Sequence, residues 1–340
     1  MTDKIKRLFE SRGLGKVEVP VTPVSGGFMH KMYKVCAGGK LYAVKYLNPE
    51  IMKRPDVMKN YEKAEKLEKI LEENSIPIVP AISINNVKMQ ELDGDYFYIF
   101  NWQEGQITDW NDITVEQCRK AGHIQGKIHA IDYPDKKCRK KTEPEIDTTD
   151  FRALIEENKA KNSLIYPVLE ENEDLLKYAL EQMNSARKNL PDLESIIDED
   201  MDPKNVMWHD GEPFVIDLEC LDYGNPVSSV IQLSLQWAGI TTCSFDPEKM
   251  HAFFEGYSEA YDNGFKNYAE VFGLAYTWVE WLEFNISRAL GKCSDENERQ
   301  LGISEVRNTV ARIKYIHDLE EKVKEQMRVM LFGNERRAGE

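Results

Sequence analysis

The stretch DEDMDPKNVMW (residues 198–208), followed shortly by FVIDLE (residues 214–219), is the most informative part of the sequence. Asp200 and Asn205 have the spacing D-x-x-x-x-N, and Asp217 ends a short apolar run. A carboxylate can accept or orient a hydroxyl proton, and a second carboxylate with an amide oxygen can hold Mg²⁺, which prefers oxygen ligands. The pattern therefore predicts a metal-assisted site; an acidic loop beside an unrelated strand is the alternative.

Two features upstream are compatible with such a site. SGGFMHKMYKV (residues 25–35) has the Gly pair Gly26-Gly27 between two predicted strands, where backbone amides can approach phosphate oxygens closely. Lys45 lies in YAVKYL among apolar strand residues, where an unpaired ammonium is costly to bury and a phosphate is a suitable partner. Each feature alone also suits a simple turn or a lysine on a solvent-facing strand.

A helix predicted from about Asp56 to Asn74 follows Lys45. Tyr61, Glu65 and Glu68 share one of its faces. One of the two carboxylates can pair with Lys45 and hold it against phosphates. A solvated face of Glu and Lys is the alternative for any single Glu of this charged helix.

The first hundred residues are rich in predicted strands. The β-branched and aromatic runs KVEVPVTPV, MYKVC, LYAVKYL and DYFYIFNW are typical of strands, and Gly26-Gly27 and Gly38-Gly39 predict hairpin turns between them. A short hinge is predicted at residues 100–102.

The rest of the chain is predicted to be mostly helical. Thr114 and Gln117 have the spacing of a capping box at the start of a helix. The exception is residues 196–223, which hold a loop and a short apolar strand. The predicted fold class is α+β with two lobes: a strand-rich, nucleotide-binding lobe at residues 1–101 and a helical lobe at residues 102–340 with the catalytic loop and the acceptor site.

In this order the motifs resemble those of the aminoglycoside phosphotransferase and choline kinase superfamily, which has a protein-kinase-like fold. The resemblance runs from about Val21 to beyond Trp237. It covers the Gly pair, the strand Lys, the helix Glu, a catalytic loop similar to H-G-D-x-x-x-x-N, and a strand similar to I-D-[FW]-E. The resemblance implies that Lys45 contacts the α/β-phosphates, that Glu65 orients Lys45, and that a hinge receives the purine.

The resemblance also implies a role for each candidate residue. The candidates are catalytic Asp200; nucleotide-binding Gly26, Gly27, Lys45, Glu65, Phe100, Asn101 and Trp102; and metal-binding Asn205 and Asp217. The implied cofactors are Mg²⁺ and ATP or GTP as the phosphoryl donor.

Two departures from the family pattern affect this region. Asp198 and Glu199 stand where the family has His and Gly, so several carboxylates that repel one another crowd one loop. Ser228 and Ser229 stand where many members have an Asp that supports the local packing.

An acceptor site is expected on YTWVEWLEFNISRAL (residues 276–290). Aromatic rings and carboxylates recur there at helical spacing and suit an amine-bearing acceptor. A buried helix with Trp in the core and Glu outside is the alternative. The acceptor candidates are Glu219, Trp278, Glu280, Trp281 and Glu283.

Composition limits the class of partner. With 340 residues and a net charge of -15, the chain lacks the basic excess that nucleic-acid binding needs. No CxxC pair indicates a zinc site, and scattered free thiols suit the cytoplasm. No signal peptide and no membrane span are predicted.

The leading hypothesis is therefore a kinase that transfers the γ-phosphoryl group of ATP or GTP to a hydroxyl of a small, amine-bearing molecule such as an aminoglycoside. A catalytically impaired nucleotide-binding or regulatory protein of the same fold is the alternative, because Asp198 and Glu199 depart from the motif. A protein kinase is disfavoured, since the A-P-E signal expected after Asp217 is missing.

Overall fold

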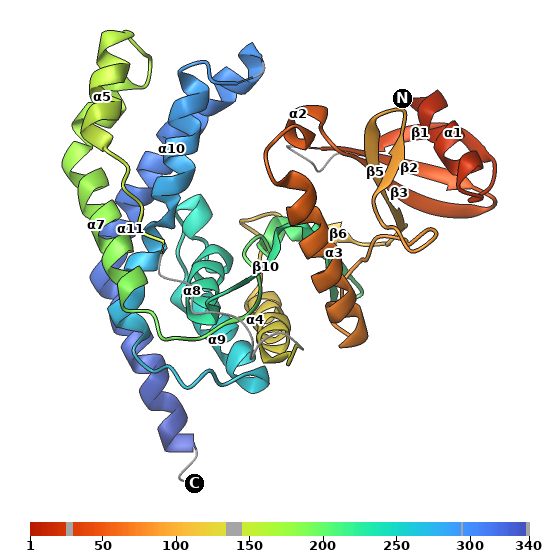
Figure 1. Cartoon of the computed structure of the whole chain (residues 1–340). Coiled ribbons are helices and arrows are strands. Elements are labelled where there is room, and N and C mark those ends of the chain that lie inside the picture. Colours follow the sequence, from red (N-terminus) through yellow and green to blue (C-terminus); the bar gives the residue numbers. More distant parts are fainter. Residues whose placement is uncertain (25–29, 134–144, 294, 338–340) are drawn as a thin grey trace. The chain divides into compact units, whose positions relative to one another are not determined.

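The strands of the N-terminal residues form one antiparallel sheet with the order β1-β2-β3-β5-β4 (Figure 1). Its members are β1 (Val17–Val24), β2 (Lys31–Ala37), β3 (Lys40–Tyr46), β4 (Gln90–Leu92) and β5 (Asp95–Asn101). Gly38 and Gly39 have φ of 57° and 73° between β2 and β3, a conformation that glycine adopts without strain. The predicted hairpin there is confirmed.

A computed structural model describes residues 1–24, 30–133, 145–293 and 295–337. The chain forms two units: Met1–Thr108 with Lys204–Asp222, and Asp109–Pro203 with Tyr223–Glu340. The predicted lobes, 1–101 and 102–340, differ from these units mainly in the segment from Lys204 to Asp222. The predicted turn at Gly26-Gly27 lies outside the described residues.

Helix α1 (Thr2–Ser11) covers one face of the sheet. Its apolar side chains Ile5, Leu8 and Phe9 are fully buried in a cluster with side chains of the sheet such as Val44. Neither this helix nor β4 was expected from the strand-rich pattern. The hydrophobic contact fixes which residues of β3 face α1 and, by alternation, which face the other way.

The opposite face of the sheet packs against α3 (Val57–Glu73). The helix begins after Asp56 and ends before Asn74, so the predicted helix is confirmed. Tyr61, Leu47 and Tyr98 belong to the cluster on this side. The short helix α2 (Pro49–Met52) joins β3 to α3.

The remaining elements of the N-terminal unit return from later in the chain. Residues Lys204–Asp222 supply β8 (Val206–His209) and β9 (Glu212–Val215), which form a sheet of order β6-β8-β9 with β6 (Gln106–Ile107). The short 3-10 helices η2 (Pro203–Asn205) and η3 (Leu218–Cys220) flank this hairpin.

The C-terminal unit is mainly helical, as predicted. Its helices are α4 (Val115–Ala130), α5 (Phe151–Ala160), α6 (Tyr166–Glu171), α7 (Glu173–Lys188), α8 (Pro226–Trp237), η4 (Ile240–Thr242), α9 (Pro247–Ala260), η5 (Tyr268–Thr277), α10 (Trp278–Ala289) and α11 (Glu296–Arg337). The strand β7 (Ser195–Asp198) pairs with β10 (Leu221–Gly224), whose last two residues belong to this unit. The capping box of Thr114 and Gln117 at the start of α4 is confirmed.

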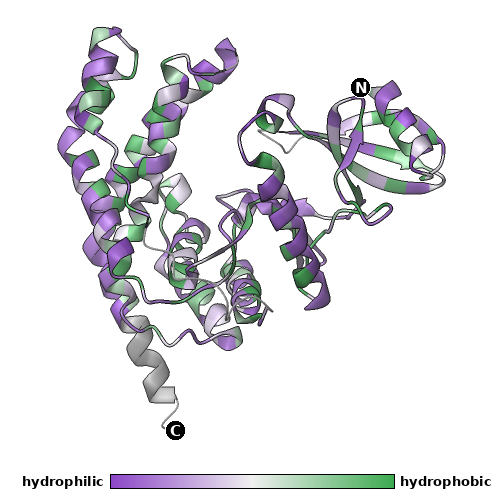
Figure 2. Cartoon of the chain, viewed as in Figure 1, coloured by the Kyte–Doolittle hydropathy of each residue, from purple (hydrophilic) through white to green (hydrophobic). Residues whose placement is uncertain are grey.

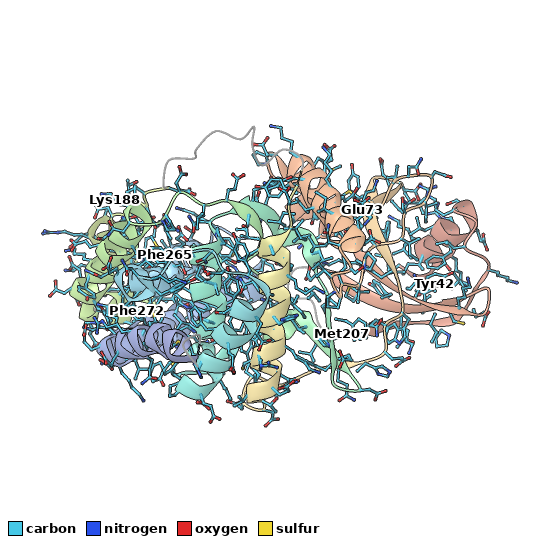
Figure 3. The ribbon with its side chains drawn as sticks, turned by 90° about the horizontal axis from the view of Figure 1, so that it is seen from below. Tyr42, Glu73, Lys188, Met207, Phe265 and Phe272 are labelled. Atoms are coloured by element: carbon cyan, nitrogen blue, oxygen red, sulfur yellow. The ribbon has the colours of Figure 1, made fainter. Side chains whose placement is uncertain are left out.

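Glycines let α4 and α9 approach each other closely. A Cβ on Gly122 would lie 1.9 Å from the carbonyl oxygen of Phe253, and one on Gly256 would lie 2.0 Å from that of Arg119. Elsewhere in the unit large apolar side chains fill the core, and Phe272 lies among its helices (Figure 3).

Within the described residues, no helix is both long and apolar enough to cross a lipid bilayer. Polar and apolar residues are mixed along the described length of α11 (Figure 2).

Candidate functional site

Strand alternation places Lys45 on the face of the sheet that packs against α3. In the β3–β5 pairing Lys45 lies opposite Tyr98, while its neighbour Val44 lies in the cluster with α1 on the other face. The side chain of Lys45 is buried, and its Nζ lies 2.6 Å from Asp217 Oδ1 and 2.5 Å from Glu219 Oε1. The structure therefore satisfies this buried ammonium with two carboxylates.

A turn after β9 brings the two carboxylates to Lys45. The N–H of Ile216 donates to the carbonyl oxygen of Asn205 at 2.9 Å, which fixes the end of the strand. Asp217 then has φ 61° and ψ 59°, a left-handed conformation that is uncommon for residues other than glycine. Strained backbone of this kind concentrates at functional sites.

The charges of the cluster stabilise one another. Burial disfavours the charged form of Lys45, but Asp217 and Glu219 outweigh this effect and raise its pKa above the ordinary value. Burial likewise disfavours ionised Glu219, yet the hydrogen bond from His30 and the charge of Lys45 lower the pKa of Glu219 to about 2. Glu219 is thus a carboxylate at neutral pH.

His30 and Tyr61 hold the other oxygen of the Glu219 carboxylate. His30 Nε2 lies 3.1 Å from Glu219 Oε2, and the Tyr61 hydroxyl donates to the same oxygen at 3.4 Å. His30 Nδ1 accepts the N–H of Asn48 at 3.0 Å, so the proton of the neutral ring is on Nε2 and faces Glu219. Sequence reasoning missed His30, because nothing in the pattern SGGFMHKMYKV indicates its partner.

Glu65 lies in the same pocket as Lys45 but has other contacts. Its Oε1 accepts the Tyr98 hydroxyl at 2.9 Å and the N–H of Met89 at 3.1 Å. The carboxylates in contact with Lys45 are instead Asp217 and Glu219, so the expected pair between Lys45 and Glu65 is not the one that the structure contains. A contribution of Glu65 to nucleotide binding stays a prediction.

The predicted hinge residues continue strand β5. Phe100 lines the pocket, Asn101 is exposed, and the N–H of Trp102 donates to the carbonyl oxygen of Leu41 at 3.1 Å. A small pocket of about 20 Å³ lies beside Lys45. Its lining is Lys45, Tyr61, Ala64, Glu65, Glu68, Ala81, Tyr98, Phe100, Asp217, Leu218 and Glu219. Gly26 and Gly27 lie outside the described residues.

Asn205 directly precedes β8 and Asp217 follows β9, so both lie beyond the open end of the β8–β9 hairpin. Val206 pairs with Val215, and the Asn205 carbonyl accepts the N–H of the residue before Asp217, so the two side chains leave neighbouring points of the backbone. An amide oxygen and a carboxylate are the donors that Mg²⁺ accepts, with waters completing its shell. The donor set fits Mg²⁺, and its binding here stays a prediction.

The loop that carries Asp200 belongs to the C-terminal unit. β7 ends at Asp198, whose buried Oδ1 accepts the N–H of Asp200 at 3.2 Å. The next residue, Met201, is buried, and its carbonyl oxygen accepts the indole N–H of Trp237 at 3.0 Å. Asp198, which replaces the His of the family, therefore takes part in shaping the turn at Asp200.

The acceptor candidates on α10 all contact other residues of the C-terminal unit. The guanidinium of Arg312 lies 3.9 Å from the centre of the Trp278 ring. The other contacts are Glu280 with Arg187, Trp281 with Glu305 and Phe284, and Glu283 with Thr149. These contacts give each side chain a structural role, and acceptor binding by them stays a prediction.

The sequence model of the phosphotransferase enzyme family matches residues 20–262. Among curated proteins the comparison finds no match.

Solved structures share the fold. The structure of spectinomycin phosphotransferase in complex with ADP and spectinomycin is 14% identical, with a TM-score of 0.70, and the match covers 96% of this chain and 99% of that one. Amicoumacin kinase in complex with AMP-PNP and Ca²⁺ is 11% identical, with a TM-score of 0.58 and coverage of 92% and 96%. Plasmodium vivax ethanolamine kinase is 15% identical, with a TM-score of 0.58 and coverage of 86% and 81%.

At these identities the likeness shows the fold, which is the two-lobed, protein-kinase-like fold predicted from the sequence. The family match covers well over half of the chain and includes the cluster of Lys45, Asp217 and Glu219 and the loop of Asp200. The chain belongs to the phosphotransferase enzyme family.

Proposed function

We propose that this phosphotransferase is a small-molecule kinase that moves the γ-phosphoryl group of ATP or GTP onto a hydroxyl of an amine-bearing acceptor. The observation that carries the proposal is the buried Lys45 beside Asp217, next to the donor set of Asn205 and Asp217. A buried ammonium and an oxygen-rich cation site together suit a nucleotide whose phosphates carry a divalent metal ion.

Each residue has a defined part in the proposed reaction. Lys45 binds the α/β-phosphates, and Asn205 and Asp217 hold Mg²⁺, which neutralises phosphate charge when bound. Asp200 accepts the proton of the acceptor hydroxyl. The acceptor oxygen forms a bond to the γ-phosphorus, the bond between that phosphorus and the β–γ bridging oxygen breaks, and a nucleoside diphosphate leaves.

The relatives support the two substrate classes. The structure of spectinomycin phosphotransferase is a complex with ADP, and that of amicoumacin kinase is a complex with AMP-PNP and Ca²⁺. Spectinomycin, bound in one similar structure, and ethanolamine, which gives another similar kinase its name, are small molecules. We extend the class, a nucleotide and a small acceptor, to this chain and leave the individual acceptor to experiment.

A thermal-shift experiment with Mg-ATP and Mg-GTP tests nucleotide binding. A ligand of the folded state at about 100 times its Kd adds roughly 2.7 kcal/mol to the free energy of unfolding. For a chain of this size, that raises Tm by about 4 °C. A panel of hydroxylated amines, scored by release of nucleoside diphosphate, then identifies the acceptor. No shift with either nucleotide at millimolar concentration contradicts the proposal.

A further inference from the structure

Both oxygens of the Glu219 carboxylate are held by side chains from other elements. Oε1 contacts Lys45 from β3, and Oε2 contacts His30 before β2 and Tyr61 from α3. A carboxylate fixed at both oxygens cannot rotate away from one partner without losing the others. Glu219 therefore gives the ammonium of Lys45 a fixed position.

Asp217, the second carboxylate at Lys45, is less suited to holding the ammonium of Lys45 in a fixed position. Its side chain is 36% exposed, whereas that of Glu219 is 20% exposed. Asp217 is also the proposed ligand of Mg²⁺, and a carboxylate that binds the metal ion is no longer fully available to Lys45. With Asp217 engaged by a metal ion, Glu219 would be the carboxylate left in contact with Lys45.

Glu65 is already committed to another contact. Its Oε1 accepts hydrogen bonds from both the Tyr98 hydroxyl and the N–H of Met89. These bonds tie α3 to β5 and to the segment before β4. The carboxylate of Glu65 would have to leave two donors before it could hold Lys45, and leaving buried donors unpaired is costly.

We propose that Glu219, held in place by His30, is the positioning residue that orients Lys45 toward the phosphates, in place of the helix residue Glu65. The inference rests on the proposed function and deepens it. The contact of His30 with Glu219 joins the residue just before β2 to the cluster around Lys45.

The test is a double-mutant cycle on the Kd of Mg-ATP, with Mg-GTP as a second probe, measured by titration calorimetry. The variants are Glu219→Gln and Glu65→Gln, each alone and combined with Lys45→Met. Glu219→Gln keeps the shape of the side chain but removes the charge that fixes Lys45, and we expect binding about tenfold weaker. Glu65→Gln is the matched control and should weaken binding by less than about threefold.

The background of Lys45→Met separates positioning from a merely structural role. If Glu219 acts through Lys45, then Glu219→Gln changes the Kd by less than about twofold once Lys45 is Met. Equal effects in both backgrounds contradict the proposal, because they show a structural role. Tighter binding by Glu219→Gln also contradicts it, because Glu219 would then act only as a charge that repels phosphate.

His30→Leu keeps the proposal testable if Glu219→Gln does not fold. This variant removes the donor to Glu219 and should weaken nucleotide binding about threefold, again only while Lys45 is present. A larger loss for Glu65→Gln than for His30→Leu overturns the proposal while the proposed function stands. Absence of nucleotide binding by the unaltered protein overturns both.

Discussion

Two glutamates, the partly buried Glu219 and the buried Glu320, lie one in each unit and have similar partners but different settings. Glu219 contacts Lys45, Tyr61 and His30. Glu320 of α11 contacts Lys324 and accepts the hydroxyls of Tyr276 at 2.7 Å and Tyr178 at 3.0 Å. In both cases a lysine and at least one tyrosine hydroxyl contact a carboxylate that would otherwise be costly to remove from water.

The settings differ in how far apart in the sequence their members lie. Lys324 is one helical turn from Glu320, so sequence spacing alone brings this pair together. The partners of Glu219 come from more than 150 positions away, and a second carboxylate, Asp217, in a left-handed conformation shares its lysine. Each lysine contacts a second carboxylate, Glu321 for Lys324 and Asp217 for Lys45. The comparison indicates that the Glu320 cluster is built on a local pair within one helix, while the Glu219 cluster joins distant segments and includes the proposed metal ligand Asp217.

Lys45→Met and Lys324→Met should differ most in the rate of phosphoryl transfer. Loss of Lys45 removes the proposed phosphate contact, and we expect phosphoryl transfer to fall by about 10³ or more, since this contact stabilises both the bound nucleotide and the transition state. Lys324→Met is the matched control and should retain transfer. The measurement is the initial rate with the acceptor found by the panel; equal rates for the two variants would remove the distinction between the clusters.

Asp200→Asn separates transfer from nucleotide binding. Asp200 lies in neither cluster, and its proposed role is to accept the proton of the acceptor hydroxyl. We expect kcat to fall by about a hundredfold or more, with the Kd of Mg-ATP nearly unchanged. Wild-type turnover of Asp200→Asn, measured beside its nucleotide affinity, would show that the role is assigned to the wrong residue.

Glu320→Ala should lower the stability of the protein and leave phosphoryl transfer unchanged. The change leaves Lys324 and two tyrosine hydroxyls without their shared acceptor, and we expect the free energy of unfolding to fall by about 3 kcal/mol. Urea unfolding monitored by circular dichroism measures the loss. The folded fraction should keep its transfer rate, and a variant as stable as the unaltered protein would show that the cluster contributes little.

Lowering the pH should reduce the difference in the free energy of unfolding between the unaltered protein and Glu320→Gln. Burial opposes ionisation of Glu320, but Lys324 and Tyr276 lower its pKa below the ordinary value of 4.5. A carboxylate with a lowered pKa in the folded state stabilises the protein above pH 4.5, and this contribution is lost as the pH falls below that value.

The same experiment applies to Glu219, whose pKa is lowered to about 2. For Glu219→Gln the stability difference should therefore persist to lower pH, shrinking between about pH 4.5 and pH 2. Unfolding curves at a series of pH values test both statements. A difference that is constant over this range would show that ionisation of these groups is not coupled to folding.

The sequence predicted what local patterns determine. Alternation in YAVKYL predicted strand β3, and the face of Lys45 follows from it. Helix α3, the capping box of Thr114 and the hairpin at Gly38-Gly39 follow from residues within a few positions of one another. These features depend on backbone propensity and short-range hydrogen bonds.

The identity of the partner of Lys45 could not be predicted in this way. Glu65 and Glu219 both had the right chemistry, and the choice between them depends on the left-handed turn at Asp217, which the apolar strand pattern does not encode. The role of His30 depends on a contact with a residue 189 positions later. Contacts of this kind are determined by the assembled fold.

A crystal structure of the protein with Mg-ADP would test whether the cluster around Lys45 is the phosphate site. We predict that Lys45 Nζ lies within about 3 Å of an oxygen of the α- or β-phosphate and keeps its contact with the Glu219 carboxylate. A nucleotide whose phosphates lie away from Lys45 would contradict the assignment of this cluster as the phosphate site.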